Sequence, residues 1–408
     1  MNKLRKLPLS ELIELRSEQI IPNPKVELNY VGLEHIKSSR FILEEFSSST
    51  EVKSSKFKFY PTDILYGKLR PYLDKTVLSD IEGICSTDIY VFRAKNQIYP
   101  KYLLSLLHSK PFRDFVDSTT VGMNLPRTSW IKIKDFCLLI PYKNNKPNLK
   151  EQKRIADKID KLFAEINKGI EKTKGALENA ESLLQSELKK IFSHKLKKNW
   201  RLIKFGGLVL PNYGLKRGPW GGSIKKSFFV PKGYKVYEQG NVISNDFRNG
   251  NYFIDKSKFN ELKGFEIKPG DLLITGAGTI GRIAVVPNDI KRGVMNQALL
   301  RVRIDENKIT KQYFVYFFQF ISNALLQGKY TKGSGLKNLV AVRELKKLLI
   351  PLPFGNNKPN LREQKKIVKR LDKIQEQSQK LQAKCEEQLK YFEMLKQSIL
   401  NQAFQGKL

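Results

Sequence analysis

Residues 144–155 read NNKPNLKEQKRI, and residues 356–367 read NNKPNLREQKKI. The second stretch follows the first in matching register, 212 positions later (144 to 356). Solenoid repeats have periods of about 20–50 residues, so a repeat this long indicates a duplicated half-protein. The chain is therefore predicted to contain two copies of one unit.

Each repeated stretch has the pattern of a helix start. Asn148 and Asn360 can each accept a hydrogen bond from an N–H of the first helical turn. Glu151 and Glu363, three residues later, are placed to reach back to the cap, as in a capping box. A proline directly before each cap prevents a helix from entering from upstream. Both copies are thus predicted to begin a helix in the same way.

The apolar positions after each start advance by four and three residues, as in a coiled coil. In the second copy they are Ile367, Leu371, Ile374, Leu381, Cys385, Phe392, Leu395 and Ile399, interrupted by the polar residues Ser378, Gln388 and Gln402. In the first copy they are Ile155, Ile159, Leu162 and Ile166, then, after a frame shift near Gly169, Leu177, Ala180, Leu184 and Ile191. Each helix spans about 45 residues, on the order of 68 Å. Packed together, the two helices are predicted to form a ruler.

The charge balance predicts a polyanionic partner. The chain has 408 residues, with 74 Lys and Arg against 40 Asp and Glu, a net charge of +34. Such a field draws a protein onto phosphates and supplies much of its non-specific affinity for nucleic acid. A lysine-rich compositional bias or a ribosomal-type role is an alternative. A membrane surface is disfavoured, because no basic amphipathic helix or lipidation signal accompanies the charge.

The cysteines and the N-terminus favour a cytoplasmic protein. Cys85, Cys137 and Cys385 lie far apart without a CxxC motif, and are interpreted as buried thiols in a reducing compartment. The first residues lack an apolar leader segment, and no run of 18 apolar residues follows. Neither secretion nor membrane insertion is therefore expected.

The first half alternates strand-like runs with turn signals, which predicts an α+β domain. Strands are expected over 56–67, 75–81, 86–94 and 134–141, with one amphipathic helix over 101–116. The basic segment 194–201 has no helical periodicity and is interpreted as the linker between halves. The second half repeats the order, with strands over 269–276, 282–286, 298–304 and 345–351 and a helix over 311–326.

The two halves of the sequence diverge but share one order of elements. Each ends in an LLIP-like strand, which is followed by P-x-L-x-E-Q and a long helix. Together with GDLLITGAGTIGRIAVV at 270–286, this order resembles the specificity (S) subunit of type I restriction-modification systems over essentially the whole chain. The resemblance implies an α+β fold with two globular target-recognition domains, separated by two long antiparallel coiled-coil helices and related by an internal pseudo-twofold repeat. The implied parts are domain 1 (1–147), the first spacer helix (148–193), domain 2 (199–359) and the second spacer helix (360–404).

The resemblance also implies partners and a division of labour. An S subunit binds double-stranded DNA and two methyltransferase (M) subunits, and through them restriction-motor (R) subunits; it does not bind a membrane. Each recognition domain reads one half-site of a bipartite target, and the M subunits, carrying S-adenosylmethionine, flip out and methylate an adenine. No cofactor and no catalytic residue is expected in this chain.

The sequence itself offers no catalytic motif. GAGTIG at 276–281 matches the dinucleotide pattern G-x-G-x-x-G, but a strand-like segment follows it instead of a helix, and Asn296 and Gln297 stand where an acidic residue is needed. A glycine-rich hairpin is therefore the favoured interpretation. His35, His108 and His194 have no Cys or His at metal-ligand spacing. We expect neither a metal site nor a cofactor site.

The candidate DNA-binding residues are loop residues that combine hydrogen-bond donors with aromatic rings. In the first domain they are Lys68, Arg70, Tyr72, Thr119, Thr120, Asn124 and Arg127. In the second domain they are Lys216, Arg217, Trp220, Arg282, Tyr330, Lys332, Ser334, Lys337 and Asn338. For each residue, a solvated loop position or a phosphate contact is the alternative to a base contact. Trp220, next to Pro219, has the further alternative of a local hydrophobic plug.

Two other functions remain open at this stage. A basic coiled-coil protein could bind nucleic acid without sequence preference or serve a structural role, and its affinity would then depend on salt alone. An enzyme with its own methyltransferase activity is the third possibility. A sequence-reading subunit differs from both, because it should prefer one bipartite duplex over random DNA by roughly 10³ or more.

Overall fold

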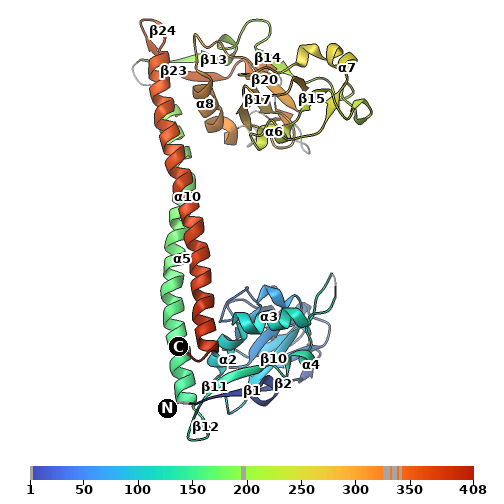
Figure 1. Cartoon of the computed structure of the whole chain (residues 1–408), viewed down its shortest axis with the longest axis vertical. Helices are drawn as coiled ribbons and strands as arrows, with labels where there is room; N and C mark the ends of the chain where they lie inside the picture. The colour runs from blue at the N-terminus through green and yellow to red at the C-terminus, as the bar shows by residue number, and fades with distance from the viewer. Residues whose placement is uncertain (1–2, 123, 194–198, 325–330, 333–337, 340–341) are drawn as a thin grey trace. The chain divides into compact units, whose positions relative to one another are not determined.

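The computed structural model describes residues 3–122, 124–193, 199–324, 331–332, 338–339 and 342–408. The chain divides into two units, each described here by itself. Unit 1 comprises residues 1–176 and 385–408, and unit 2 comprises residues 177–384. Each unit joins one globular α+β part to segments of two long helices, so the predicted fold class is confirmed (Figure 1).

The two repeated stretches begin the two longest helices. Helix α5 (Leu149–Phe192) and helix α10 (Leu361–Phe404) each run for 44 residues. The Asn148 side chain accepts a hydrogen bond from the Glu151 N–H (3.2 Å), and the Asn360 side chain accepts one from the Glu363 N–H (3.0 Å). Both predicted N-caps are therefore present.

The predicted capping box is wrong in one respect: the glutamate side chain does not accept a hydrogen bond from the N–H of the cap residue. The backbone N–H of Asn148 donates to the carbonyl of Pro141 (2.8 Å), and the same bond joins Asn360 to Pro353 (2.8 Å). The cap N–H therefore already has a partner in the preceding strand. The Glu151 carboxylate instead pairs with an arginine one turn later (2.8 Å), and this hydrogen bond lowers the pKa of Glu151.

The helices pack antiparallel within each unit. As residue numbers rise along α5, the residues that they contact on α10 have falling numbers. In unit 2, the Ser378 hydroxyl donates to the carbonyl of Ala180 (2.6 Å), and Arg370 pairs with Glu187 (2.5 Å). In unit 1, Gly169 lies directly against the ring of Phe392. The predicted pairing of the two helices is confirmed.

The buried seam of α10 differs from the predicted one at its centre. The apolar spacing places Leu381 in the seam, but its side chain is 43% exposed. Ser378 and Cys385 are each 4% exposed and occupy the interface, whereas Gln388 lies on the surface. Ser378 tolerates burial because its hydroxyl has a backbone acceptor on α5.

Unit 1 is built around a four-stranded sheet in the order β2-β10-β7-β8. Side chains alternate across it: Ile64 and Tyr66 face the core beneath the helices, whereas Leu65 faces a five-stranded sheet in the order β3-β6-β9-β4-β5. A third sheet, β1-β11-β12, leads into α5. The strands are β1 (Lys3–Pro8), β2 (Ile13–Arg16), β3 (Gln19–Ile20), β4 (Asn29–Val31), β5 (Ser47–Ser48), β6 (Lys56–Phe59), β7 (Ile64–Gly67), β8 (Thr76–Leu78), β9 (Gly83–Cys85), β10 (Ile89–Ala94), β11 (Cys137–Lys143) and β12 (Lys146–Pro147).

Short helices connect these strands. They are α1 (Leu9–Leu12), α2 (Pro100–Leu107), α3 (Lys110–Thr119), α4 (Trp130–Ile133) and the 3₁₀ turns η1 (Ser49–Glu51) and η2 (Pro71–Leu73). The single helix predicted over 101–116 is wrong, because the chain breaks at His108 and restarts as α3 with Pro111 in its first turn. The single strand predicted over 56–67 is likewise two strands, β6 and β7, with a turn between them.

Unit 2 repeats this plan. Its four-stranded sheet has the order β14-β20-β17-β18, with β13-β23-β24 leading into α10 and β16-β15-β19 covering the second face. The strands are β13 (Trp200–Lys204), β14 (Leu215–Arg217), β15 (Tyr234–Tyr237), β16 (Phe253–Ile254), β17 (Leu272–Thr275), β18 (Ile283–Val285), β19 (Gly293–Met295), β20 (Leu299–Val302), β21 (Thr331–Lys332), β22 (Asn338–Leu339), β23 (Leu349–Gly355) and β24 (Lys358–Pro359). The helices are α6 (Gln239–Ile243), α7 (Lys256–Glu261), α8 (Lys311–Ala324), α9 (Val342–Leu345) and the 3₁₀ turns η3 (Phe205–Gly207), η4 (Lys226–Phe228) and η5 (Lys263–Phe265).

The repeat extends to individual hydrogen bonds. In unit 1 the Asp63 carboxylate accepts from the N–H of Tyr60 (2.9 Å), and in unit 2 the Asp271 carboxylate accepts from the N–H of Lys268 (2.8 Å). Each aspartate immediately precedes the central strand of its sheet, β7 or β17. The two units therefore share one backbone frame.

The linker and the cysteines differ in part from expectation. Of the predicted linker, residues 194–198 lie outside the described residues, while Trp200 and Arg201 belong to β13 rather than to a linker. The prediction of three buried thiols is wrong at one site: Cys85 and Cys385 are buried, but Cys137 is exposed at the start of β11.

Candidate nucleic-acid interface

Unit 1 brings its predicted residues together from two loops. The loop between β7 and β8 carries Lys68, Arg70 and Tyr72. Thr119 ends α3, and the segment between α3 and α4 carries Thr120, Asn124 and Arg127. The Arg70 N–H donates to the carbonyl of Pro126 (2.7 Å), and the Thr128 N–H donates to the carbonyl of Lys68 (3.0 Å). These bonds hold the two loops edge to edge.

The second loop is a small hairpin. Val121 and Arg127 exchange two backbone hydrogen bonds (3.1 and 3.0 Å), which places exposed Asn124 between them near the tip. The Arg127 guanidinium pairs with Asp88 (3.2 Å) at the start of β10. Arg127 thus helps to fix the hairpin, while Asn124 remains at the surface.

The predicted residues of unit 1 differ in their freedom to bind a ligand. The hydroxyls of Thr119 and Thr120 donate to carbonyls at the end of α3 (both 2.8 Å), so their protons are committed to the helix end. Lys68 extends over the ring of Tyr90, with its Nζ 5.2 Å from the ring centre. Arg70 is exposed, and Tyr72 is 55% exposed. Arg70 and Tyr72, together with Asn124, are therefore exposed members of the group.

A buried carboxylate anchors the β7–β8 loop. Asp74 is 5% exposed and sits beside the ring of His108 (Oδ1 to Nδ1, 2.8 Å). The hydroxyl of Ser39 donates to Asp74 Oδ2 (2.8 Å), and the Arg113 guanidinium lies 3.7 Å from the same oxygen. Arg113 also donates to Gln397 of α10 (2.8 Å). The loop is therefore tied through Arg113 to α3 and α10, and the buried His108 ring holds Asp74.

In unit 2, residues 276–281 form the predicted glycine-rich turn. Strands β17 and β18 pair antiparallel on either side of it, and the Thr275 N–H donates to the carbonyl of Arg282 (2.9 Å). Gly278 and Gly281 have φ values of +64° and +85°, which favour glycine. Because a strand follows the turn, the dinucleotide interpretation fails and the hairpin is confirmed. Arg282 is exposed at its end.

This hairpin occupies the same place as the Arg70 loop of unit 1. The Gly276 N–H donates to the carbonyl of Ala298 (2.7 Å), as the Lys68 N–H donates to the carbonyl of Asp88 (3.0 Å). Both loops therefore leave their central strand at the same point. The seven residues of one (68–74) and the six of the other (276–281) differ almost entirely.

Strand β14 carries two more predicted residues. Lys216 stacks on Phe265, with its Nζ 4.4 Å from the ring centre; burial and the nearby Arg301 lower the pKa of Lys216. Arg217 donates to the carbonyl of Gly276 (3.4 Å) and so braces the hairpin. Trp220 is 91% exposed, so the alternative of a hydrophobic plug is wrong.

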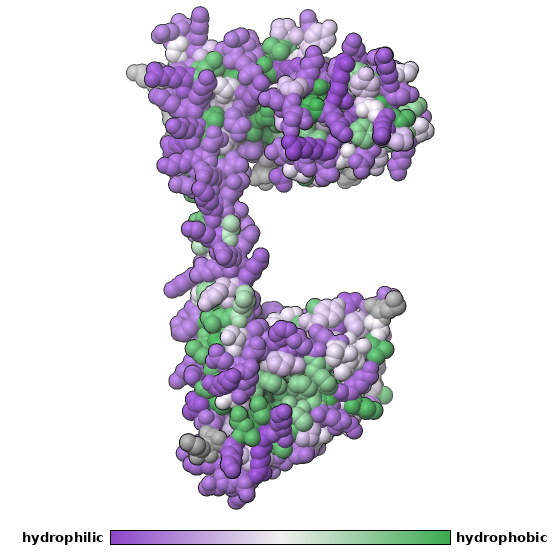
Figure 2. Space-filling view, in the orientation of Figure 1, coloured by the Kyte–Doolittle hydropathy of each residue, from purple (hydrophilic) through white to green (hydrophobic). Residues whose placement is uncertain are grey.

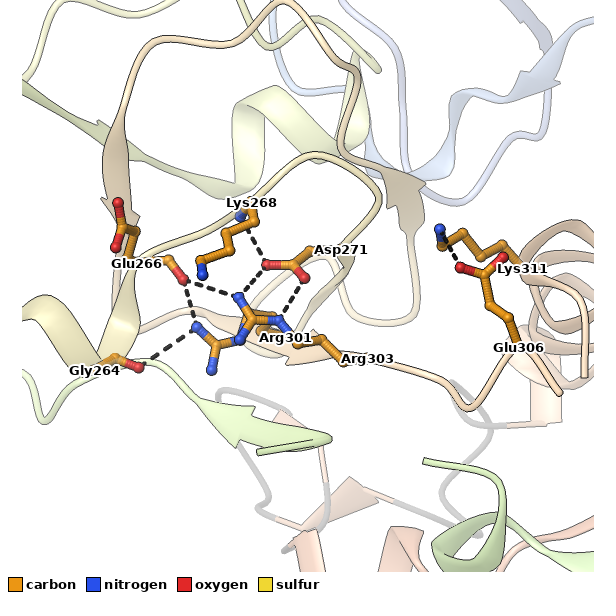
Figure 3. Close-up of polar contacts among 8 residues, drawn as sticks. All are labelled: Gly264, Glu266, Lys268, Asp271, Arg301, Arg303, Glu306 and Lys311. Carbon is orange, nitrogen blue, oxygen red and sulfur yellow. Dashed lines mark hydrogen bonds and ion pairs between the residues drawn. The ribbon is translucent and has the colours of Figure 1, made fainter. Parts of the chain in front are cut away.

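A set of charged residues around β20 and the start of β17 was missed by sequence reasoning. Arg303 forms two hydrogen bonds with Asp271 (2.6 and 2.8 Å), and Arg301 donates to the carbonyl of Glu266 (2.5 Å; Figure 3). Arg301 is 2% exposed, and burial lowers its pKa. Its position in β20 matches Val91 in β10, since each lies opposite the second residue of the paired central strand, Leu273 or Leu65. Apolar patterning does not indicate an arginine there.

The remaining predicted residues belong to the segment between α8 and α9. Tyr330, Ser334 and Lys337 lie outside the described residues. Lys332 and Asn338 lie in β21 and β22, which pair antiparallel. A contact of these five residues with DNA stays a prediction.

Neither a metal site nor a membrane span is found in the parts of the chain that the structure describes. Among the described residues, no group of three or more His, Cys, Asp or Glu is placed to hold an ion. No helix in the described ranges is both long and apolar enough to cross a bilayer. Hydrophilic residues dominate the face of unit 2 that Figure 2 shows.

Comparison with known proteins gives a consistent result. The profile of the type I restriction modification DNA specificity domain matches residues 221–391. The chain is 24% identical to the EcoBI specificity subunit of Escherichia coli, covering 86% of this chain and 74% of that protein. It is 26% identical to the putative MjaX specificity subunit of Methanocaldococcus jannaschii, covering 94% and 88%. A match to the Escherichia coli EcoDI specificity subunit reaches 31% identity but spans only 32% of that protein.

Solved structures share the fold over nearly the whole chain. One comes from a study titled as the structural basis of complex assembly and conformational transition of the type I R-M system (TM-score 0.79, 21% identity, covering 99% of this chain and 98% of that one). The HsdS subunit of Thermoanaerobacter tengcongensis gives a TM-score of 0.60 at 22% identity, covering 99% and 97%. The duplicated frame, the paired long helices and these relatives agree: the chain is similar over most of its length to the DNA specificity subunits of type I restriction-modification systems.

Proposed function

We propose that this chain reads a bipartite DNA sequence, with one half-site read by the globular part of each unit. The main observation in support is that the two units share one backbone frame but differ in their loops. The loops at 68–74 and 276–281 leave equivalent strands through the same hydrogen bond, yet their residues diverge. A common frame with unlike loops suits two readers of different sequences.

The exposed donors and rings on these loops have the chemistry needed for reading. Arg70 and Arg282 can contact guanine edges or phosphates, and Asn124 suits adenine. The net charge of +34 supplies attraction to the DNA backbone. Charge alone would also fit a non-specific binder, so the diverged loops distinguish the proposal from that rival.

The two long helices are proposed to set the distance between the half-sites. Each is unbroken over 44 residues, and a helix of that length measures about 66 Å. Readers held roughly 34 Å or somewhat more apart would meet the same side of the duplex after about one turn. The helix length would then fix the number of unread base pairs.

We also propose that catalysis belongs to partner subunits. Two methyltransferase subunits, each with S-adenosylmethionine, would dock on exposed parts of the helices and methylate an adenine in each half-site. Restriction-motor subunits would join through them. Incubating the purified chain alone with DNA and labelled S-adenosylmethionine tests this division, since label transfer without the partner would contradict it.

A competition experiment separates sequence reading from non-specific binding. The chain with its methyltransferase partner should prefer one bipartite duplex over random DNA by roughly 10³ or more. A basic structural protein would show equal affinity for both and a loss of binding with salt alone. Modified-base sequencing of host DNA would identify the bipartite methyl-adenine motif to use as the probe.

A paired insertion tests the proposed ruler. One heptad is inserted after Ala180 in α5 and one after Gln377 in α10, which keeps the bond between Ser378 and Ala180 and adds two turns to the pair. The accepted spacing should lengthen while both half-site sequences stay the same. An insertion in α5 alone is the control and should disrupt the helix pair. An unchanged spacing in the methylated motif of the paired variant would defeat the ruler.

A further inference from the structure

Trp220 is the most exposed of the large apolar side chains that the structure describes, at 91%. It begins a tight turn with the sequence WGGS, in which the Ser223 N–H donates to the carbonyl of Trp220 (2.8 Å). A Cβ at Gly221 or Gly222 would meet open space, so no neighbour crowds the tip among the described residues. The ring is therefore presented to solvent.

The turn is held firmly at its base. Pro219 and Ile224, on either side of the tip, are buried, and Ile224 packs into a small core with Val236. The Gly218 N–H donates to the carbonyl of Leu299 (2.8 Å). A Cβ at Gly218 would lie 1.9 Å from the carbonyl of Asn296, so the backbone is packed tightly against the start of β20. An exposed ring on a fixed base loses little conformational freedom on binding.

The Trp220 turn and the glycine-rich hairpin rise from the same place. The Gly218 N–H donates a hydrogen bond to the carbonyl of Leu299, and the Gly276 N–H donates one to the carbonyl of the adjacent Ala298. The Arg217 side chain, at the end of β14, also donates to the carbonyl of Gly276. The Trp220 turn and the hairpin therefore begin next to each other on the sheet.

The segment around Trp220 carries charge of one sign. Residues 215–226 include Lys216, Arg217, Lys225 and Lys226 and contain no Asp or Glu. Lys225 and Lys226 are exposed. An apolar ring flanked by cations without acidic residues suits a polyanion that also offers flat apolar surfaces, and nucleic acid has both.

Unit 1 has no counterpart of this turn at the matching position. Lys216 pairs with Arg301 across the sheet, and Arg16 pairs with Val91, so Arg16 and Lys216 are equivalent. After Arg16 the chain enters β3, and Glu18 pairs with Lys58 (2.7 Å). The Trp220 turn is therefore an addition specific to unit 2.

We propose that the Trp220 ring inserts as a wedge against an unstacked base step in the half-site that unit 2 reads. This inference rests on the proposed function. Apolar side chains inserted in this way partly unstack the duplex and favour the steps that deform most easily. Trp220 would then add a preference for a deformable step, beside any base contacts made by the hairpin at 276–281.

The test uses the full chain with its methyltransferase partner and a pool of random-sequence duplexes. Bound duplexes are sequenced for the wild type and for Trp220→Ala and Trp220→Phe, and the affinity for the best selected duplex is then measured. Tyr213→Ala is the matched control, because Tyr213 is a 67% exposed aromatic residue of the same unit that lies before the cationic segment. Because both rings are exposed, neither Trp220→Ala nor Tyr213→Ala should change the melting temperature.

Trp220→Ala should weaken binding by roughly 5- to 160-fold, which corresponds to about 1–3 kcal/mol for one stacked base. It should flatten the preference at one step of the second half-site and leave the first half-site intact. The slope of affinity against salt should not change, because no charge is removed. Trp220→Phe should keep most of the affinity, and Tyr213→Ala all of it.

Three outcomes bear on the inference separately from the proposed function. If the wild type selects no bipartite motif, the proposed function fails and the inference fails with it. If the wild type selects a motif and Trp220→Ala selects it with equal affinity, the wedge alone is overturned. If Trp220→Ala instead loses the methyltransferase partner on gel filtration with an unchanged DNA profile, the ring is a protein contact and the wedge is likewise overturned.

Discussion

The ring of Phe392 occupies the space that a side chain at position 169 would need. A Cβ built on Gly169 would lie 2.6 Å from Phe392 Cζ, closer than packed carbon atoms approach. Gly169 is also where the apolar spacing of α5 shifts frame. The glycine therefore admits a large ring from α10 at the point where the regular seam is interrupted.

Gly169→Ala should destabilise unit 1 although alanine is the better helix former. The alanine gains about 1 kcal/mol in helix propensity, but overpacking against the ring costs about 1–3 kcal/mol. In a Phe392→Leu background the clash is relieved, and the same substitution should stabilise by up to about 1 kcal/mol. Urea unfolding followed by circular dichroism measures both changes, and the double-mutant cycle gives the coupling.

Gly175→Ala provides the control for this prediction. A Cβ at Gly175 meets no atom within 4 Å, so alanine there should stabilise by up to about 1 kcal/mol in either background. Equal effects at positions 169 and 175 would show that Phe392 does not press on Gly169.

Asp74→Asn should loosen the β7–β8 loop. The substitution tolerates the left-handed backbone at this position (φ +51°) but removes the charge beside His108 and Arg113. Hydrogen bonds to a charged group contribute about 1.5–3 kcal/mol, so unfolding of unit 1 should become easier by about that amount. Thermal unfolding measures the change, and the DNA preference should weaken at the first half-site only.

The control for Asp74 is Asp114→Asn. Asp114 pairs with Lys110 on the surface of α3, where an exposed ion pair contributes less than about 1 kcal/mol. Equal destabilisation by the two substitutions would contradict a special role for the buried carboxylate.

The three thiols should react at very different rates. Cys137 is exposed, whereas Cys85 and Cys385 are buried, and burial raises the pKa of Cys85 to about 12. Since the thiolate is the reactive form, a thiol reagent at about pH 8 should modify Cys137 first under native conditions. Mass spectrometry of the labelled protein checks the order, and rapid labelling of Cys85 in the native protein would contradict the structure.

Lys216 should make unit 2 more stable at alkaline pH. Burial, and then repulsion from Arg301, lower the pKa of Lys216 below its ordinary value of 10.5, so the folded protein holds this proton less tightly than the unfolded chain. The charged lysine therefore opposes folding below its folded pKa. This cost should disappear as the pH rises from that value to about 10.5.

Comparison with Lys216→Met isolates this effect from other groups that titrate in the same range. The unfolding free energy of the wild type should rise relative to the variant between neutral pH and about pH 10.5. Adding Arg301→Met to both proteins should reduce the rise, since it removes one of the two causes. A difference that stays constant with pH would contradict the lowered pKa of Lys216.

Much of the fold could be predicted because the duplicated stretches specify their own local structure. Asn148 and Asn360 act as caps in any context that supplies a helix, and the strand–turn–helix order follows from them. The reverse glutamate bond could not be predicted, because its place is taken by the carbonyls of Pro141 and Pro353, whose approach depends on tertiary packing.

The errors in the seam of α10 and in the helix predicted over 101–116 have different causes. Apolar spacing favours Leu381 as a core residue, but the interface is decided by where α5 offers an acceptor, and Ser378 meets the carbonyl of Ala180. The helix over 101–116 has one continuous apolar pattern, yet it breaks at His108, whose ring is fixed beside Asp74. The first is a long-range contact that no local pattern records, whereas Pro111, in the first turn of α3, is a local signal for the break.

The candidate interface was predictable in part. Loop composition identified Arg70 and Asn124, and the structure places their loops side by side. Loop composition could not separate exposed side chains from those that already form hydrogen bonds, such as Thr119, whose hydroxyl donates to a carbonyl at the end of α3. The sequence also gave no sign of Arg301, because a buried strand is expected to carry apolar residues and not an arginine.

The arginine in β20 limits how parts of the two halves can be exchanged in a chimera. A graft between halves moves surface residues only if it is limited to the exposed loop positions, such as Arg70, Tyr72 and Thr279, because Asp74 and Ile280 of the same loops are buried. Grafting residues 299–302 in place of 89–92 would also carry Arg301 to the site of Val91, which is fully buried among Val31 and Leu65. At that site the guanidinium would lack the carbonyls of Gly264 and Glu266, to which it donates hydrogen bonds in unit 2. Designed hybrids with altered target sequence should therefore exchange the exposed loop residues and leave the strands in place.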